Sequence, residues 1–291
     1  MSASASSPPP SAIVTRLRAA GCVFAEDEAR LLISAASTPA DLAAMVDRRA
    51  AGLPLEHVVG WAEFCGLHIA VDPGVFIPRR RSEFLVRQAA SLGRQASGPL
   101  GQAPGPAPQA TASRPGRAGP PAVIVDLCCG SGALGAAVTA ALDRAELYAV
   151  DIDPAAVRCA RRNLTASGGR VYEGDLYQPL PSSLRGRVVI LLANVPYVPT
   201  DAVRTLPPEA RLHEARLALD GGPDGLDVLR RVAAAAPFWL TPGGHLLIET
   251  SERQAQGAAE AFALAGLTTR VVSSADLNAT VVIGTRSGRN G

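Results

Sequence analysis

Apolar residues recur every three or four positions in the first part of the chain, a spacing that is typical of amphipathic helices. We expect helices over residues 11–20 and 25–36, and a third that begins after Thr38, a favourable N-cap residue. From Glu63 onward, apolar and polar residues alternate instead, which predicts a short β-hairpin. A further helix is expected over residues 82–92. This part of the chain is therefore predicted to be a small helical unit followed by a hairpin and a connecting helix.

Short, continuous apolar runs separated by helical stretches begin at residue 122. Runs of this kind predict parallel strands that are buried on both faces by helices. The expected strands are 122–127, 146–150, 170–173, 188–193, 245–250, 268–272 and 279–284, and the expected helices are 133–142, 154–167, 224–240 and 253–265. The predicted fold class is α/β, a doubly wound, Rossmann-like domain that binds its ligand at the C-terminal ends of its strands.

Two low-complexity segments divide the chain. Residues 1–10 are rich in Ser and Pro, and residues 93–121 are rich in Gly, Pro, Ala, Ser and Gln, so we expect both to be flexible. The predicted organisation is a disordered terminus at 1–10, a helical domain at 11–60, a hairpin and connecting helix at 61–92, a flexible linker at 93–121 and the α/β domain at 122–286.

The composition limits the classes of partner. The formal net charge of the 291 residues is only +2, which gives no whole-chain argument for binding nucleic acid or an anionic membrane. No segment has the pattern of a membrane span or a signal peptide, so we expect a cytoplasmic location. The five cysteines and four histidines show no metal-ligand spacing, so we expect reduced thiols and no metal. No amphipathic face is left without a partner, which favours a monomer.

A glycine-rich turn, Asp126-Leu-Cys-Cys-Gly-Ser-Gly132, follows the first strand of the α/β domain and opens a helix. Such a turn alone is a weak signal, because dinucleotide-binding proteins also use it. Asp151, at the end of the second strand, can accept hydrogen bonds from both hydroxyls of a ribose, and Asp175, after the third, can meet an adenine amino group. Asp126 would repel a pyrophosphate but suits the cationic methionine end of S-adenosyl-L-methionine. The predicted residues for binding this cofactor are Asp126, Cys128, Cys129, Gly130, Ser131, Gly132, Asp151, Asp175, Leu176 and Asn194.

The tetrapeptide Asn194-Val-Pro-Tyr197 directly follows the fourth strand, which places it beside the cofactor site. A planar nitrogen is a poor nucleophile because its lone pair is delocalised, so an enzyme must hold it in line with the methyl group. The Asn194 side-chain oxygen and the Val195 carbonyl can accept its two N–H groups and favour the positive charge that grows on it. Tyr197 can cover its flat face. The predicted catalytic residues are Asn194, Val195, Pro196 and Tyr197.

These motifs resemble those of the HemK-type protein-(glutamine-N5) methyltransferases. Further similar segments are Pro54-Leu-Glu-His-Val-Val-Gly60, Glu63-Phe64, Phe76-Ile-Pro-Arg79 with Glu83, Ala218-Leu-Asp-Gly-Gly-Pro-Asp-Gly-Leu226, and Pro242-Gly-Gly with Glu249. The resemblance implies S-adenosyl-L-methionine-dependent methylation of a protein glutamine, namely the Gly-Gly-Gln glutamine of a peptide-chain release factor. It also implies that the helical domain at 11–60 recognises this substrate.

The chain departs from the family pattern, which marks it as a divergent member. Val195 stands where the family usually has a proline, and Cys128 stands where it usually has a glycine. Pro196 still biases Val195 toward an extended backbone, so we expect the reaction to survive. The helical domain is also shorter than that of the family.

Two other functions remain open at this point. One is methyl transfer to an amino group of adenine or guanine in RNA or DNA, with Tyr197 stacked on the base. The other is a cofactor-binding scaffold without catalysis. The low net charge and the lack of a nucleic-acid-binding motif argue against the first, and the intact tetrapeptide argues against the second.

Several charged residues near these motifs have ordinary structural explanations. Arg79 is expected to form a buried ion pair with Glu83, whereas Arg80 and Arg81 are expected in a solvated turn. Glu214 falls in a predicted lid over the site, where it either faces the site or caps a helix.

Overall fold

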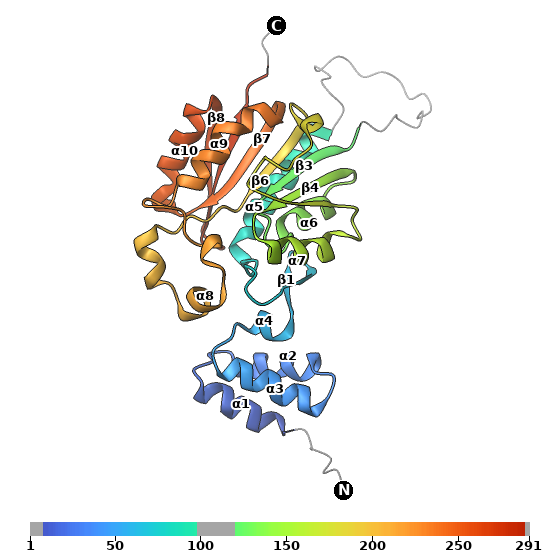
Figure 1. Cartoon of the computed structure of the whole chain (residues 1–291), viewed down its shortest axis with the longest axis vertical. Coiled ribbons are helices and arrows are strands. Elements are labelled where there is room, and N and C mark those ends of the chain that lie inside the picture. The colour runs from blue at the N-terminus through green and yellow to red at the C-terminus, as the bar shows by residue number, and fades with distance from the viewer. Residues whose placement is uncertain (1–7, 98–119, 289–291) are drawn as a thin grey trace, which may run out of the picture.

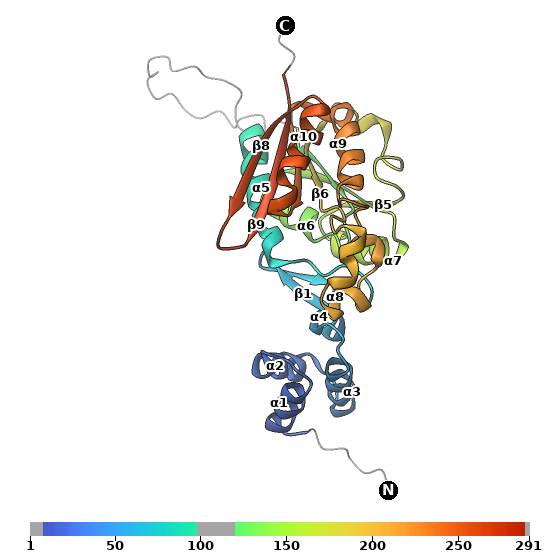
Figure 2. The same cartoon turned by 90° about the vertical axis from the view of Figure 1, so that its left-hand side faces the viewer.

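The computed structural model describes residues 8–97 and 120–288. A small helical unit lies at one end of the molecule, a large α/β domain lies at the other, and a β-hairpin lies between them (Figures 1 and 2). Residues 1–7 and 98–119, which include most of the two segments expected to be flexible, are outside the described residues, as are 289–291.

The N-terminal unit consists of the helices α1 (Pro10–Ala19), α2 (Ala25–Ala35), α3 (Pro39–Ala50) and α4 (Leu55–Val59). Their apolar faces meet in a small core of their own, which includes Ile13, Leu17, Leu32 and Val46. Thr38 caps α3 as expected, because its hydroxyl accepts a hydrogen bond from the Asp41 N–H at 3.1 Å. The short α4 was not predicted; it ends at Gly60, where φ is +85°.

Seven strands form one sheet in the order β5-β4-β3-β6-β7-β9-β8. They are β3 (Ala122–Leu127), β4 (Ala145–Asp151), β5 (Arg170–Glu173), β6 (Val188–Ala193), β7 (Leu240–Thr250), β8 (Leu267–Ser274) and β9 (Ala279–Arg286). Neighbouring strands are parallel, except that β9 is antiparallel to both β7 and β8. The strand order reverses between β3 and β6, which opens a crevice at their C-terminal ends.

Helices cover both faces of the sheet. One face packs against α5 (Glu83–Ser97), α6 (Ala133–Ala140) and α7 (Pro154–Leu164), together with the hairpin of β1 (Trp61–Phe64) and β2 (Leu67–Ala70). The other face packs against α9 (Asp227–Trp239) and α10 (Ala255–Leu264). Alternate residues of β3 enter the two cores, Ile124 the first and Val125 the second, which explains its continuous apolar run. The predicted doubly wound, Rossmann-like α/β fold is confirmed.

Several element boundaries differ from the prediction. Helix α5 continues through Ser97, so the segment expected to be a flexible linker from residue 93 begins inside a helix. Gly93 is closely packed there, because a Cβ at this position would lie 3.1 Å from a methyl carbon of Leu142. Helix α9 begins three residues later than expected, because Asp224 forms a turn in which its carboxylate accepts a hydrogen bond from the Leu226 N–H at 3.0 Å.

A long connection between β6 and α9 folds over the C-terminal edge of the sheet. It contains the 3₁₀ turns η3 (Thr200–Thr205) and η4 (Arg216–Ala218) on either side of α8 (Pro208–His213); the remaining 3₁₀ turns are η1 (Arg80–Ser82), η2 (Ser182–Leu184) and η5 (Glu252–Gln254). Helix α8 lies on the side of the sheet that faces the helical unit (Figure 1). Arg49 of α3 donates a hydrogen bond to Glu209 of α8 at 2.8 Å, so the connection is joined to that unit.

Candidate active site

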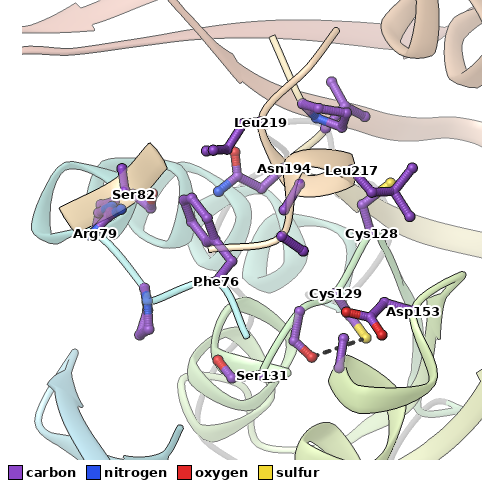
Figure 3. A pocket seen from close by; sticks show the side chains of 18 of the residues that line it. Phe76, Arg79, Ser82, Cys128, Cys129, Ser131, Asp153, Asn194, Leu217 and Leu219 are labelled. Carbon is purple, nitrogen blue, oxygen red and sulfur yellow. Dashed lines mark hydrogen bonds between the residues drawn. The ribbon is translucent and has the colours of Figure 1, made fainter. Parts of the chain in front are cut away.

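The crevice at the ends of β3, β4 and β6 contains a cavity of about 470 Å³, a size typical of small-molecule sites. Its walls come from the glycine-rich turn after β3, the end of β4, the tetrapeptide after β6, the segment between the hairpin and α5, and the connection that carries α8. Figure 3 shows Asn194 between Phe76 on one side and Cys128 and Leu217 on the other. The cavity therefore joins the predicted cofactor turn to the predicted catalytic tetrapeptide.

The turn after β3 has a left-handed backbone at several positions. The φ angle is +54° at Gly130 and +79° at Gly132, which glycine adopts without strain. It is also +53° at Cys128, where a side chain disfavours this conformation. The structure thus explains why glycine suits position 128, and the Cys128 side chain lines the cavity.

Asp151 is held at the end of β4 by backbone hydrogen bonds. Its carboxylate oxygens accept N–H groups from Gly130 at 2.8 Å and from Asp153 at 2.9 Å, and its side chain lines the cavity. Burial raises the pKa of Asp151 above its usual value, and the backbone hydrogen bonds oppose this shift. Each oxygen keeps a lone pair for a further donor, such as a ribose hydroxyl. Asp153 caps α7 by accepting the Ala155 N–H at 2.8 Å.

Not every predicted cofactor residue reaches the cavity. Those that line it are Cys128, Cys129, Gly130, Ser131, Asp151 and Asn194; those that do not are Asp126, Gly132, Asp175 and Leu176.

The two acids that do not line the cavity, Asp126 and Asp175, have partners elsewhere. Asp126 is fully buried, with one carboxylate oxygen accepting the Gly135 N–H at 2.9 Å, and burial raises its pKa to about 7. Asp175 forms an ion pair with Arg231 of α9 at 2.5 Å. Sequence position placed both acids at the correct strand ends but did not predict the direction of their side chains.

All four residues of the tetrapeptide line the cavity. The Asn194 side chain makes no hydrogen bond to any residue in the described part of the chain, so its amide is available to a ligand. Val195 is buried with an exposed fraction of 1%. Its hydrophobic side chain therefore anchors the loop in the core while the backbone of the loop faces the crevice.

A glycine-rich segment before α9 holds the tetrapeptide from behind. The Val198 N–H donates to the Leu219 carbonyl at 3.0 Å, and the Gly221 N–H donates to the Val198 carbonyl at 2.9 Å. A Cβ at Gly221 would lie 2.5 Å from the Pro196 carbonyl oxygen, so only glycine fits this approach. The Gln254 side-chain amide adds a hydrogen bond to the Tyr197 carbonyl at 2.8 Å.

Arg81 lies in the exposed turn η1 as expected, but its side chain also contacts Tyr197, which the prediction did not include. The Arg81 guanidinium donates one hydrogen bond to the Tyr197 hydroxyl and another, of 2.9 Å, to Glu249 at the end of β7. Burial raises the pKa of Tyr197 to about 12, so its phenol is protonated at neutral pH. No local sequence pattern indicated this contact, because the three residues are far apart in the chain.

Arg79 forms a buried ion pair, but its partner is Glu214 rather than the predicted Glu83. One guanidinium nitrogen of Arg79 lies 2.6 and 2.7 Å from the two carboxylate oxygens of Glu214, and Oε1 also accepts the Ile77 N–H at 3.2 Å. The Glu214 side chain is only 1% exposed. This pair ties the connection that carries α8 to the segment before α5, a function that the lid hypothesis did not anticipate.

Both arginines of the described cavity wall are paired with an acidic residue. Among its described residues, the cationic ones are Arg79 and Arg81, and each is neutralised by a buried glutamate. The other charged lining residues are acidic, namely Asp151, Asp153 and Glu209, and the uncharged polar ones include Ser131, Asn194 and Tyr197. A wall of this kind suits a cationic or neutral ligand better than a phosphate.

Within residues 8–97 and 120–288, no group of three His, Cys, Asp or Glu side chains is arranged to hold a metal ion. No helix in the same ranges is long and apolar enough to cross a membrane.

Comparison with known proteins identifies the family. Residues 118–226 match the model of the methyltransferase small domain. The chain is 36% identical over 233 residues to a release factor glutamine methyltransferase of Geobacter sulfurreducens, which covers 78% of this chain and 72% of the relative. It is 36% identical over 255 residues to the protein of that name from Mycolicibacterium smegmatis, covering 86% and 82% of the two chains. A 4-amino-L-phenylalanine/4-methylamino-L-phenylalanine methyltransferase of Streptomyces pristinaespiralis is 32% identical over 221 residues, covering 76% and 69%. The chain therefore belongs to the release factor glutamine methyltransferase family.

Proposed function

We propose that the protein transfers a methyl group from S-adenosyl-L-methionine to the side-chain amide nitrogen of a glutamine in a peptide-chain release factor. The observation that carries this proposal is the presence, in one cavity, of the Asp151 carboxylate and the free amide of Asn194. The names of the relatives from Geobacter and Mycolicibacterium supply the substrate.

The residues of the turn after β3 and of β4 fit S-adenosyl-L-methionine. Gly130 keeps the backbone bare where a ligand must approach closely, since a Cβ there would meet only Phe76, at 3.9 Å. Asp151 presents its remaining lone pairs to ribose hydroxyls, and the half-exposed Ile152 beside it offers apolar surface to an adenine ring. When bound, the cofactor supplies an electrophilic methyl group.

The tetrapeptide suits an amide acceptor. The Asn194 side-chain oxygen and the Val195 carbonyl accept the two N–H groups of the glutamine amide, which fixes the orientation of the nitrogen and its lone pair. The same two oxygens stabilise the positive charge that develops on the nitrogen as the new bond forms. The proton is released after methylation, so the reaction needs no strong general base.

A free amino acid, which the relative from Streptomyces pristinaespiralis uses, fits the cavity less well. Its carboxylate would be a charge of the acceptor itself, and the two arginines at the acceptor end of the described cavity wall are already paired with Glu214 and Glu249. A glutamine within a polypeptide carries no such charge beside the acceptor. This difference favours the protein substrate.

The Asn194→Ala variant tests the role of the tetrapeptide. We expect the turnover number to fall by about 10²–10³-fold, because one preorganised acceptor is lost. The dissociation constant for S-adenosyl-L-homocysteine, measured by calorimetry, should stay within about twofold, since the variant leaves Asp151 and the glycine turn intact. Equal turnover in Asn194→Ala and the unaltered protein would exclude this mechanism.

A further inference from the structure

Arg81 joins three separate elements at the acceptor end of the cavity. It lies in η1 at the start of α5, its Nε donates to the Glu249 carboxylate of β7 at 2.9 Å, and its Nη2 donates to the Tyr197 hydroxyl. Its guanidinium carbon also lies 5.8 Å from the centre of the Tyr197 ring. Arg81 lines the cavity itself.

We infer that Arg81 and Glu249 form a positioning pair, which fixes the Tyr197 ring as a wall of the acceptor site and keeps that wall free of net charge. The inference rests on the proposed function, because it assigns these residues a role in the same methyl transfer.

The positioning role follows from how Tyr197 is held. The hydrogen bonds of Gln254 and of the segment 219–225 fix its backbone, but they leave the two side-chain torsions free. The contact with Arg81 fixes the far end of the ring. Arginine suits this task because its planar fork donates to the phenol and the carboxylate together in one rigid geometry. A lysine in the same place has a single, flexible ammonium group.

The neutralising role follows from the charge of the reaction. The acceptor nitrogen becomes positive as it is methylated, and S-adenosyl-L-methionine itself carries a positive sulfonium. An uncompensated guanidinium in the same cavity would repel both. Glu249 prevents this; its side chain is only 3% exposed, whereas that of Arg81 is 43% exposed, so water screens the pair only from the arginine side.

The second oxygen of Glu249 is buried and has no hydrogen-bond partner among the described residues. A buried carboxylate with one oxygen unsatisfied is costly to maintain. The Arg81 guanidinium is the cation that stabilises it in the structure. Glu249 therefore depends on Arg81, so that removal of Arg81 alone should lower the stability of the fold more than removal of both residues.

The test compares Glu249→Gln, Arg81→Met, the double variant and Arg81→Lys, each checked for folding by its melting temperature. The direct readout is the affinity for S-adenosyl-L-methionine divided by that for S-adenosyl-L-homocysteine, because the two ligands differ in the charge of the sulfur. In Glu249→Gln this ratio should fall by at least about threefold, and in the double variant it should return to the original value. An unchanged ratio in Glu249→Gln, or a ratio that stays low in the double variant, would overturn the inference.

Turnover tests the positioning of Tyr197. Arg81→Met and Tyr197→Phe should each lower the turnover number by about tenfold, and combining them should cause no further loss, since both remove the same contact. Arg81→Lys should restore part of the loss. Losses that add in the combined variant would contradict the positioning role. If no protein glutamine is methylated at all, the proposed function fails, whereas the affinity ratio still decides whether Arg81 and Glu249 form a neutral pair.

Discussion

Arg79→Met is expected to destabilise the fold by leaving the carboxylate of Glu214 without its cation. The variant removes both short hydrogen bonds, of 2.6 and 2.7 Å, and leaves Glu214 with only the 3.2 Å bond from the Ile77 N–H. Because the Glu214 side chain is 1% exposed, its carboxylate depends on Arg79 for most of its stabilisation in the folded state.

The size of the expected destabilisation follows from the exposed fractions of the Glu214 and Arg79 side chains. Removing one partner of a buried ion pair costs about 3–5 kcal/mol. Arg79 itself is 34% exposed, so water can enter the space that it leaves, and we expect the lower end, about 3 kcal/mol. For a chain of this size, that change lowers the melting temperature by about 6 °C. Arg80→Met is the matched control: Arg80 is exposed, and the change should alter stability by less than about 0.5 kcal/mol.

The assay is urea denaturation of both variants at pH 8 and pH 5. Burial raises the pKa of Glu214, and Arg79 opposes this shift, so removing Arg79 raises that pKa further. As the pH falls, protonation neutralises the unpaired Glu214 carboxylate. The loss in free energy of unfolding caused by Arg79→Met should therefore be smaller at pH 5 than at pH 8. A deficit equal to that of Arg80→Met, or one that does not change with pH, would refute the reasoning.

Three other variants test separate features of the structure. Cys128→Gly should raise the melting temperature slightly, because relief of the left-handed strain at φ +53° contributes about 1 kcal/mol; a lower value would contradict this. The pKa of Asp126 is raised to about 7 in the folded state, so the free energy of unfolding should fall by up to about 4 kcal/mol as the pH rises from about 4 to 7. Denaturation of Asp126→Asn should show no such decline. Arg49→Met should weaken the helical unit by about 3 kcal/mol, measured by hydrogen exchange, because it removes the partner of the buried Glu28; Arg48→Met is the exposed control.

Local sequence patterns predicted most of the fold. Continuous apolar runs identified the central strands, because β3 and β6 are buried on both faces, and the Thr38 cap located the start of α3. The spacing of apolar residues did not predict α4, because this helix spans only five residues and is too short to show a helical period. It also failed at residues 93–97, where composition suggested a linker but tertiary contacts with α6 and Leu142 continue the helix.

The candidate site was predictable where the chain itself brings residues together. Asn194 and Tyr197 follow one strand directly, so their place in the crevice could be inferred from topology. The partners of Arg79 and Arg81 could not, because they are separated by 135 and 168 residues and meet only in the folded chain. The sequence pattern also could not predict the direction of side chains. The Asp126 side chain is buried in the core, and the Asp175 side chain forms an ion pair with Arg231.

The most direct test of the account is transfer of a radiolabelled methyl group to purified release factors, with and without substitution of the glutamine in their Gly-Gly-Gln motif by alanine. Total protein and RNA serve as parallel substrates, and Asn194→Ala serves as the enzyme control. The account predicts label on the intact release factor, none on the substituted one, and almost none with Asn194→Ala. Label that persists on the substituted release factor, or that appears on RNA instead, would contradict it.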